Sequence, residues 1–317
     1  MHRAPLARLG GGTDMSDPLI LALPSKGRLK EQAEAWLADC GFVLKATGGA
    51  RGYRAAIDRL PDVQVQLLSA GDIAVALDAG EAHLGVTGED LLRERGEGVD
   101  GRVMLLRPLG FGRADVVVAA PKSWIDVETM TDVEEVAAAY LARTGRRLRV
   151  ATKYTVLTRG FFSQHGVTDY RIVESSGATE GAPAAGAAEL IVDITTTGAT
   201  LAANNLKPLA DGVILKSEAQ LAAGLKAPWT HEQVETTRGF LRAVEARARA
   251  RELATVAWAG QEGDGLNRGL LTPIGELFQT AEDLAATGVG PTTANRPDYV
   301  FQADCPAADA LAGALGL

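Results

Sequence analysis

The sequence predicts an α/β fold built on mostly parallel sheet. Short apolar runs of strand length, the first at 19–23, alternate with longer segments whose apolar residues recur at helical spacing. This alternation continues to about residue 204, and glycines repeatedly end the helical segments. Strands joined through helices lie parallel, and such sheets bind ligands at the carboxyl ends of their strands. Candidate functional residues are therefore expected in the loops that follow strands.

Composition and charge narrow the class of protein. The chain has 317 residues, of which 46% are hydrophobic, so one large domain or a few small ones are expected. The net charge of -8 argues against non-specific nucleic-acid binding, and no apolar run reaches transmembrane length. Cys40 and Cys305, the only cysteines, fit a reducing compartment. Residues 1–16 lack the apolar segment of a signal peptide. We therefore expect a cytoplasmic protein with a disordered extension over 1–16 and with neither nucleic acid nor membrane as a partner.

The expected elements follow in order along the chain. The hydrophobic pattern predicts strands at 19–23, 63–68, 83–88, 103–109, 114–120, 146–152, 170–174 and 189–195. It predicts helices at 29–40, 70–80, 132–143, 156–165 and 199–204. A long amphipathic helix is expected from 229 to about 251, with short strands at 254–258 and 299–302. The rest of the tail is weakly patterned, so we expect 229–317 to form a separate appendage.

The stretch DITTTGATL, at 193–201, is the strongest candidate for a ligand-binding loop. It joins the apolar strand ending near 195 to a short helix, and the N–H groups at a helix start lack internal partners. Gly198 lets the backbone approach a phosphate closely, and Asp193 can accept hydrogen bonds from sugar hydroxyls. The residues of the loop that would surround an anion are Thr195, Thr196, Thr197, Gly198, Ala199 and Thr200. On these residues alone, an anion cradle and a merely capped turn are both open.

Basic residues mark two further loops. Ser25-Lys26-Gly27-Arg28 follows the first strand and opens a helix, where positive side chains oppose the helix dipole. A bound anion would explain Lys26 and Arg28, whereas the alternative is a pair of solvated charges. Arg51 and Arg54 form a second basic cluster in a predicted loop. A solvated face is its default interpretation, but guanidinium groups also match phosphate geometry.

Four segments in order resemble the ATP phosphoribosyltransferases, the first enzymes of histidine biosynthesis. They are LPSKGRL (23–29), HLGVTGEDLL (83–92), RVATKYTVLTRGFF (149–162) and SSGATEGAPAAGAAELIVDITTTGATLAANNL (175–206). The resemblance covers roughly residues 19–225. It implies transfer of the phosphoribosyl group of phosphoribosyl pyrophosphate (PRPP) to N1 of the adenine of ATP, with release of pyrophosphate and a requirement for Mg²⁺.

The resemblance also implies the domain organisation. The core would be a two-domain, periplasmic-binding-protein type II-like α/β fold with ligands in the cleft. Domain I would comprise 17–112 plus a return segment at 205–228, and domain II would comprise 113–204. The segment 229–317 would be an α+β C-terminal extension or a degenerate regulatory domain.

Roles for the candidate residues follow from the same resemblance. The 195–200 loop would hold the 5′-phosphate of PRPP, and Asp193 and Glu180 would face the ribose hydroxyls and the developing sugar cation. Lys26 and Arg28 would stabilise the departing pyrophosphate. Ser25, Gly27, Arg51 and Arg54 would complete the ATP and pyrophosphate site. Mg²⁺ would be held through substrate phosphates rather than by a protein cage.

Two departures from the family pattern affect these expectations. Ser69 stands where family members carry an arginine before the Asp72 segment, which leaves open which basic residue takes over its role. The tail has the length of a histidine-binding regulatory domain but lacks a clear closing strand. Histidine inhibition, a histidyl-tRNA-synthetase-like regulatory subunit and a homo-oligomer (a dimer or a hexamer) are possibilities that the family implies.

Three other functions compete with this one. A catalytically weak or regulatory homologue would keep the fold and lose the chemistry, and Ser69 is the residue that raises this possibility. A solute- or nucleotide-binding protein of the same fold would bind ligand without turnover. A transferase acting on a free nucleobase shares the acidic and Thr-Gly loop, although the other three matched segments argue against it.

Overall fold

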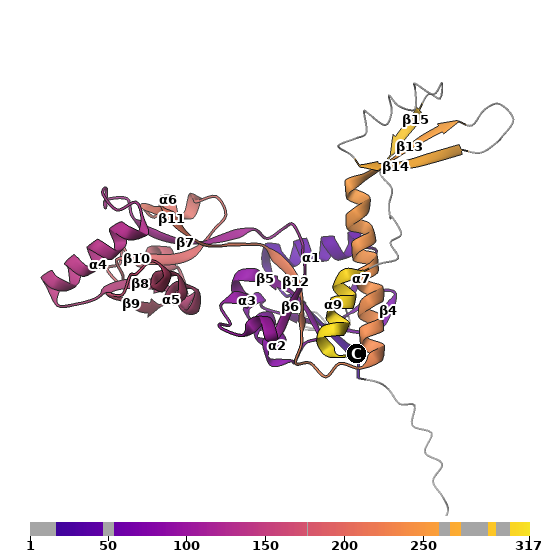
Figure 1. Ribbon diagram of the computed structural model, residues 1–317, viewed down its shortest axis with the longest axis horizontal. Coiled ribbons are helices and arrows are strands. Elements are labelled where there is room, and N and C mark those ends of the chain that lie inside the picture. Colours follow the sequence, from indigo (N-terminus) through magenta and orange to yellow (C-terminus); the bar gives the residue numbers. More distant parts are fainter. Residues whose placement is uncertain (1–16, 47–53, 176, 260–266, 274–290, 296–304) are drawn as a thin grey trace, which may run out of the picture.

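The structure, a computed structural model, describes residues 17–46, 54–175, 177–259, 267–273, 291–295 and 305–317. The expected N-terminal extension at 1–16 lies outside the described residues, as does Arg51. Two α/β domains lie side by side, and a long helix carries a small third sheet away from them (Figure 1). No helix in the described ranges is both long and apolar enough to cross a membrane.

Domain I is built on a seven-stranded sheet in the order β2-β3-β4-β1-β5-β12-β6. Its strands are β1 (Leu19–Pro24), β2 (Leu44–Ala46), β3 (Arg54–Ile57), β4 (Leu60–Leu68), β5 (Leu84–Gly88), β6 (Val103–Pro108) and β12 (Ala219–Gly224). Its helical segments are α1 (Gly27–Asp39), α2 (Ala70–Ala79), α3 (Glu89–Arg93) and the 3₁₀ turn η1 (Val99–Gly101). Helix α2 starts at the Ser69 cap and ends at Gly80, whose φ of 82° suits only a residue without a Cβ.

Domain II is built on a five-stranded sheet in the order β11-β7-β10-β8-β9. Its strands are β7 (Ala114–Pro121), β8 (Leu148–Thr152), β9 (Tyr170–Glu174), β10 (Leu190–Thr195) and β11 (Leu206–Ser217). Its helical segments are α4 (Met130–Thr144), α5 (Thr155–Gln164), α6 (Ala199–Ala203) and the 3₁₀ turn η2 (Thr179–Gly181). A capping box between Thr129 and Asp132 starts α4, since each side chain accepts a hydrogen bond from the other's backbone N–H.

The two domains repeat one topology. In each, three parallel strands (β4-β1-β5 and β9-β8-β10) are followed by an antiparallel strand that arrives from the other domain, β12 and β7 respectively. An outer strand, β6 or β11, then pairs antiparallel with the incoming one. The predicted α/β class and the type II-like two-domain core are confirmed. The expectation of mostly parallel sheet is wrong, because antiparallel pairs form where the chain crosses between domains and also at the β2-β3-β4 edge of domain I.

The chain passes between the domains twice, from β6 to β7 and from β11 to β12. Strand β11 pairs with β7 along its length, so residues 206–217 belong to domain II. The predicted return to domain I at residue 205 is therefore too early, and the second crossing lies near Glu218. No strand was predicted here, because Pro208 and two register shifts interrupt β11, and alanine and glycine make up most of β12.

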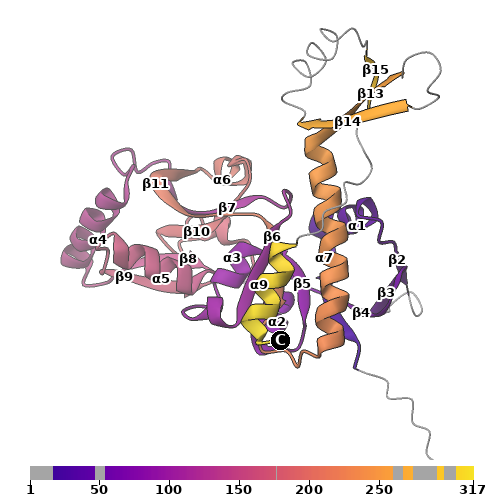
Figure 2. The ribbon, with the colours of Figure 1, turned by 45° about the vertical axis from the view of Figure 1, so that its right-hand side comes forward.

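The C-terminal region is divided between two places. Helices α7 (His231–Glu252) and α9 (Pro306–Leu315) lie beside each other on domain I (Figure 2). Phe240, Leu241 and Leu311 belong to the same buried cluster as Leu21 and Val65 of the domain I sheet. Only the antiparallel sheet of β13 (Leu253–Ala259), β14 (Asn267–Pro273) and β15 (Pro291–Asn295) stands apart (Figure 1). The predicted appendage is thus partly wrong, since its helices complete the domain I core. The strand predicted at 299–302 lies outside the described residues.

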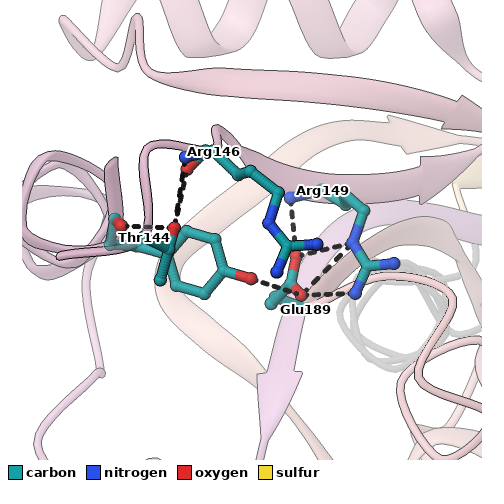
Figure 3. A network of polar contacts seen from close by, with 5 residues as sticks. Thr144, Arg146, Arg149 and Glu189 are labelled. Atoms are coloured by element: carbon teal, nitrogen blue, oxygen red, sulfur yellow. Dashed lines mark hydrogen bonds and ion pairs between the residues drawn. The ribbon is translucent and has the colours of Figure 1, made fainter. Parts of the chain in front are cut away.

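An ion-pair network fixes the amino-terminal edge of the domain II sheet. Glu189, which precedes β10, accepts a 2.6 Å hydrogen bond from the Arg149 guanidinium and a 2.7 Å bond from the Arg149 N–H (Figure 3). Tyr140 of α4 donates to the same carboxylate at 3.3 Å. Burial opposes ionisation of Glu189, but the bonds from Arg149 outweigh it and lower the carboxyl pKa. The network ties β8, β10 and α4 together at the edge opposite the loops that carry the candidate site.

Candidate active site

A cleft of about 340 Å³ lies between the domains, at the carboxyl ends of their parallel strands. Domain I contributes the start of α1 and the end of β5, and domain II contributes the ends of β8 and β10. The crossing segment before β7 forms part of the wall. The lining residues are Arg28, Leu29, Gln32, Ala70, Gly88, Asp90, Leu91, Gly112, Arg113, Ala114, Lys153, Tyr154, Ile194 and Thr196.

The threonine-rich loop between β10 and α6 reaches this cleft through Thr196, whose hydroxyl donates to the Arg113 carbonyl at 3.2 Å. Thr195 Oγ1 accepts from the Gly198 N–H at 2.9 Å, so this hydroxyl shapes the turn. Gly198 has a φ of 73°, which an L side chain rarely adopts. Thr197, Ala199 and Thr200 are exposed. The loop therefore combines a turn held by its own hydroxyl with side chains that are open to a ligand.

Asp193 and Glu180 lie near each other beside this loop. Burial raises the pKa of the Asp193 carboxyl, and the Glu180 charge raises it further. The Ile194 N–H, which donates to Asp193 Oδ1 at 2.8 Å, and the Lys153 charge act in the opposite direction. A partly buried carboxylate with a second carboxylate charge nearby favours a positively charged neighbour.

The basic turn after β1 is placed at the same edge. Gly27 has a φ of 73°, and a Cβ there would meet no atom within 4 Å, so the backbone conformation rather than crowding favours glycine. Lys26 is exposed at the N-cap of α1, and no side chain caps that helix start. Arg28 lines the cleft, and the Ser25 N–H donates to the Leu68 carbonyl at 2.8 Å.

The remaining sequence candidates are less central. Arg54 is exposed at the first position of β3, two strands from β1, and is not among the cleft-lining residues. Ser69 caps α2 by accepting from the Asp72 N–H at 3.2 Å, and its hydroxyl donates to the Asp72 carboxylate at 2.6 Å. Ser69, which stands where the resemblance led us to expect an arginine, therefore acts as a local helix cap.

No role was predicted from sequence for Arg113, Lys153, Asp90 or Tyr154, although the last three lie in segments that carry the family resemblance. With Arg28, the first two bring positive charge into the cleft from α1, the crossing segment and the end of β8. Lys153 follows a predicted strand directly, which is the signal that could have identified it. Arg113 stands after two glycines with positive φ, Gly110 and Gly112, at a crossing that only the fold reveals.

Buried polar contacts join the two domains next to the cleft. Tyr154 of domain II donates from its hydroxyl to Asp90 of domain I at 2.6 Å, and Ser217 donates to the other oxygen of Asp90 at 2.9 Å. Glu94 accepts hydrogen bonds from the N–H groups of Val156 and Leu157, at 2.8 and 3.0 Å. A carboxylate of domain I thus caps helix α5 of domain II.

No three His, Cys, Asp or Glu side chains gather as a metal site within the described ranges. The site suits a ligand that carries both phosphate and sugar groups. Its basic residues and open backbone turns can bind phosphate, and its carboxylates can accept hydrogen bonds from sugar hydroxyls.

Comparisons with known proteins agree with this arrangement. The family model described as "HisG: ATP phosphoribosyltransferase" matches residues 69–243. ATP phosphoribosyltransferase of Caulobacter vibrioides (strain NA1000 / CB15N) is 62% identical over 95% of this chain and 99% of its own length. That of Bradyrhizobium diazoefficiens is 50% identical over 92% of this chain and 97% of its own. Among solved structures, the ATP phosphoribosyl transferase (HisG:HisZ) complex from Thermotoga maritima aligns with a TM-score of 0.55. It is 26% identical and covers 72% of this chain and 96% of that one. The chain belongs to the ATP phosphoribosyltransferase family.

Proposed function

We propose that the protein transfers the 5-phosphoribosyl group of PRPP to N1 of the adenine ring of ATP in the cytoplasm, as the first step of histidine biosynthesis. Family membership supports the reaction. The single structural observation that supports it best is the meeting of the threonine-rich loop after β10 with Arg28 and Lys153 in one interdomain cleft. Two polyanionic substrates must be held side by side there, and clustered cations offset their repulsion.

The proposed chemistry exchanges one bond for another. The bond from C1 of the ribose to the pyrophosphate oxygen breaks, and a bond from C1 to adenine N1 forms. The electron pair of the broken bond leaves with pyrophosphate. Asp193 and Glu180 stabilise the positive charge that develops on the sugar, while Lys26 and Arg28 stabilise the leaving anion. N1 already carries a lone pair, so no general base is required.

Mg²⁺ belongs to this proposal as a partner of the substrates. Bound with the phosphates, it would neutralise the pyrophosphate as that group departs. The donor set fits, because a nearby cation would offset the burial and the Glu180 charge that together raise the pKa of Asp193. The protein's own residues would orient the substrates around it.

Assembly and regulation are proposed from the family. The related Thermotoga maritima protein forms a HisG:HisZ complex, which makes a second, regulatory subunit a candidate partner here as well. A homo-oligomer and inhibition by histidine are proposed from the family in the same way. Histidine titration of the activity, with sedimentation analysis of the protein, tests both.

Pyrophosphate release tests the reaction directly. With ATP, PRPP and Mg²⁺, we expect the protein to release pyrophosphate and to form a product with altered adenine absorbance. The absence of release, also after addition of a candidate regulatory subunit, would contradict the enzyme proposal. Ligand binding without turnover would instead favour a binding protein of the same fold.

Thr197→Ala tests the assignment of the loop. Removing a hydroxyl that bonds the 5′-phosphate should raise the KM for PRPP about tenfold, the effect of about 1.4 kcal/mol. The KM for ATP should change much less. Thr168→Ala, at an exposed threonine before β9, is the matched control. Equal losses for both substrates would indicate that Thr197 only stabilises the turn.

A further inference from the structure

Lys153 lies beside a tyrosine that makes a hydrogen bond across the domains. Its Nζ lies 4.8 Å from the centre of the Tyr154 ring, close enough for attraction between a cation and an aromatic face. Tyr154 is 1% exposed, so its ring has little freedom. Its hydroxyl is bound at 2.6 Å by Asp90, which belongs to the other domain.

Asp90 is itself held rigidly. The carboxylate is 7% exposed and accepts one hydroxyl on each oxygen, from Tyr154 and from Ser217. The Asp90 N–H donates back to Ser217 Oγ at 3.0 Å. A Cβ on Gly88 would lie 2.2 Å from Asp90 Oδ1, so only glycine at that position leaves room for the carboxylate. The group is built from α3, from the end of β11 and from the loop after β8.

We propose that Tyr154 is a positioning residue whose bond to Asp90 places Lys153 in the cleft when the two domains are together. The ring supports the ammonium group of Lys153, and Asp90 fixes the ring. Opening of the domains breaks the bond and releases the cation from its place near Asp193. The complete anion site therefore exists only in the joined arrangement, which couples substrate binding to domain position. This inference rests on the proposed function and adds a residue that acts on the site through Lys153.

A double-mutant cycle tests the proposal. Tyr154→Phe keeps the ring and removes the hydroxyl, so we expect about a tenfold loss in kcat/KM for PRPP, equivalent to about 1.4 kcal/mol. Lys153→Ala should cause a loss at least as large. If Tyr154 acts through Lys153, then Tyr154→Phe in the Lys153→Ala background should cause no further loss. The proposal would be overturned if the loss in the double variant equals the product of the two single losses. It would also be overturned if Tyr154→Phe alone causes no loss in kcat/KM.

Three further measurements keep the result interpretable. Tyr140→Phe removes a 3.3 Å bond to Glu189 at the far edge of domain II and should leave kcat/KM unchanged. Ser217→Ala weakens the hold on Asp90 and should give a smaller loss that is also absent in the Lys153→Ala background. Calorimetric binding of PRPP to the same variants should show the same coupling without turnover. PRPP binding by the wild type and the variants could show this coupling while the wild type releases no pyrophosphate. In that case the proposed reaction fails and the positioning role of Tyr154 stands.

Discussion

At the scale of single residues, the candidate site contains a carboxylate, Asp193, whose surroundings disfavour its charged form. Asp193 is partly desolvated beside Glu180, and both effects disfavour its charged form. Such a carboxylate destabilises the folded state at neutral pH, so its placement points to a role in binding or catalysis rather than in folding. Glu189 is the opposite case, because Arg149 compensates its burial within the protein itself.

Asp193→Asn tests this contrast. A raised carboxyl pKa means that the native state loses stability as the pH rises from 3.8, the ordinary value, through the folded pKa. The substitution removes that loss, so we expect Tm at neutral pH to rise by about 1–3 °C. The rise should disappear as the pH approaches 3.8. The kcat should fall by about 100-fold, because the variant loses the carboxylate that we propose to face the developing sugar cation.

Calorimetry across a pH series and steady-state kinetics measure these two effects. Asp169→Asn, at the other end of the domain II sheet, is the control and should alter neither. A variant that is less stable at neutral pH would show that the Ile194 N–H and the Lys153 charge outweigh the burial of Asp193.

At the scale of elements, the start of helix α5 links the two domains. Glu94 accepts hydrogen bonds from two N–H groups in the first turn of α5 and from Thr155 Oγ1 at 3.2 Å. A helix end that is normally satisfied within its own domain is here satisfied by the neighbouring one. The cap therefore stabilises the helix and the interdomain arrangement together.

We expect Glu94→Ala to cost about 1–2 kcal/mol of unfolding free energy, the usual value of a lost cap. Because the cap crosses between domains, the radius of gyration in solution scattering should also increase. Glu97→Ala, at an exposed glutamate three residues later, should change neither quantity. Loss of stability with an unchanged radius would mean that the remaining contacts alone hold the domains together.

At the scale of the whole molecule, the C-terminal helices are part of domain I. Phe240 of α7 is 2% exposed and packs edge-on to Trp36, with ring centres 6.3 Å apart, and against Phe42 at 5.1 Å. Arg247 of α7 forms a 2.8 Å ion pair with Asp39 at the end of α1. Helix α7 therefore packs directly on the domain that carries Arg28.

Phe240→Ala should destabilise the protein by about 3–5 kcal/mol, since it leaves a large cavity in a shared core. Urea unfolding followed by circular dichroism measures the loss. Ile125→Ala, at a side chain that is 76% exposed, should cost little. A small effect of Phe240→Ala would indicate that domain I folds independently of α7, as the sequence-based expectation of a separate appendage implies.

Sequence periodicity was sufficient where an element carries its own pattern. The apolar run of β1, the amphipathic spacing of α1 and the threonine-rich loop after β10 are local signals, and the chain positions of these elements were predicted closely. Strands β2 and β3 were missed because they are only three and four residues long. Strands β11 and β12 were missed because their pairing partners lie far away along the chain.

In the candidate site too, residues with a local sequence signal were predicted, and contacts between distant segments were not. Arg28 and the 193–200 loop were identifiable from sequence, since a residue after a strand and before a helix lies at a predictable edge. The pairing of Asp90 with Tyr154, 64 residues apart, was not, and neither was the capping of α5 by Glu94. Local patterns specify helices, strands and the loops between them. Which loops meet across a cleft depends on the two chain crossings between the domains, and those exist only once the sheets have formed.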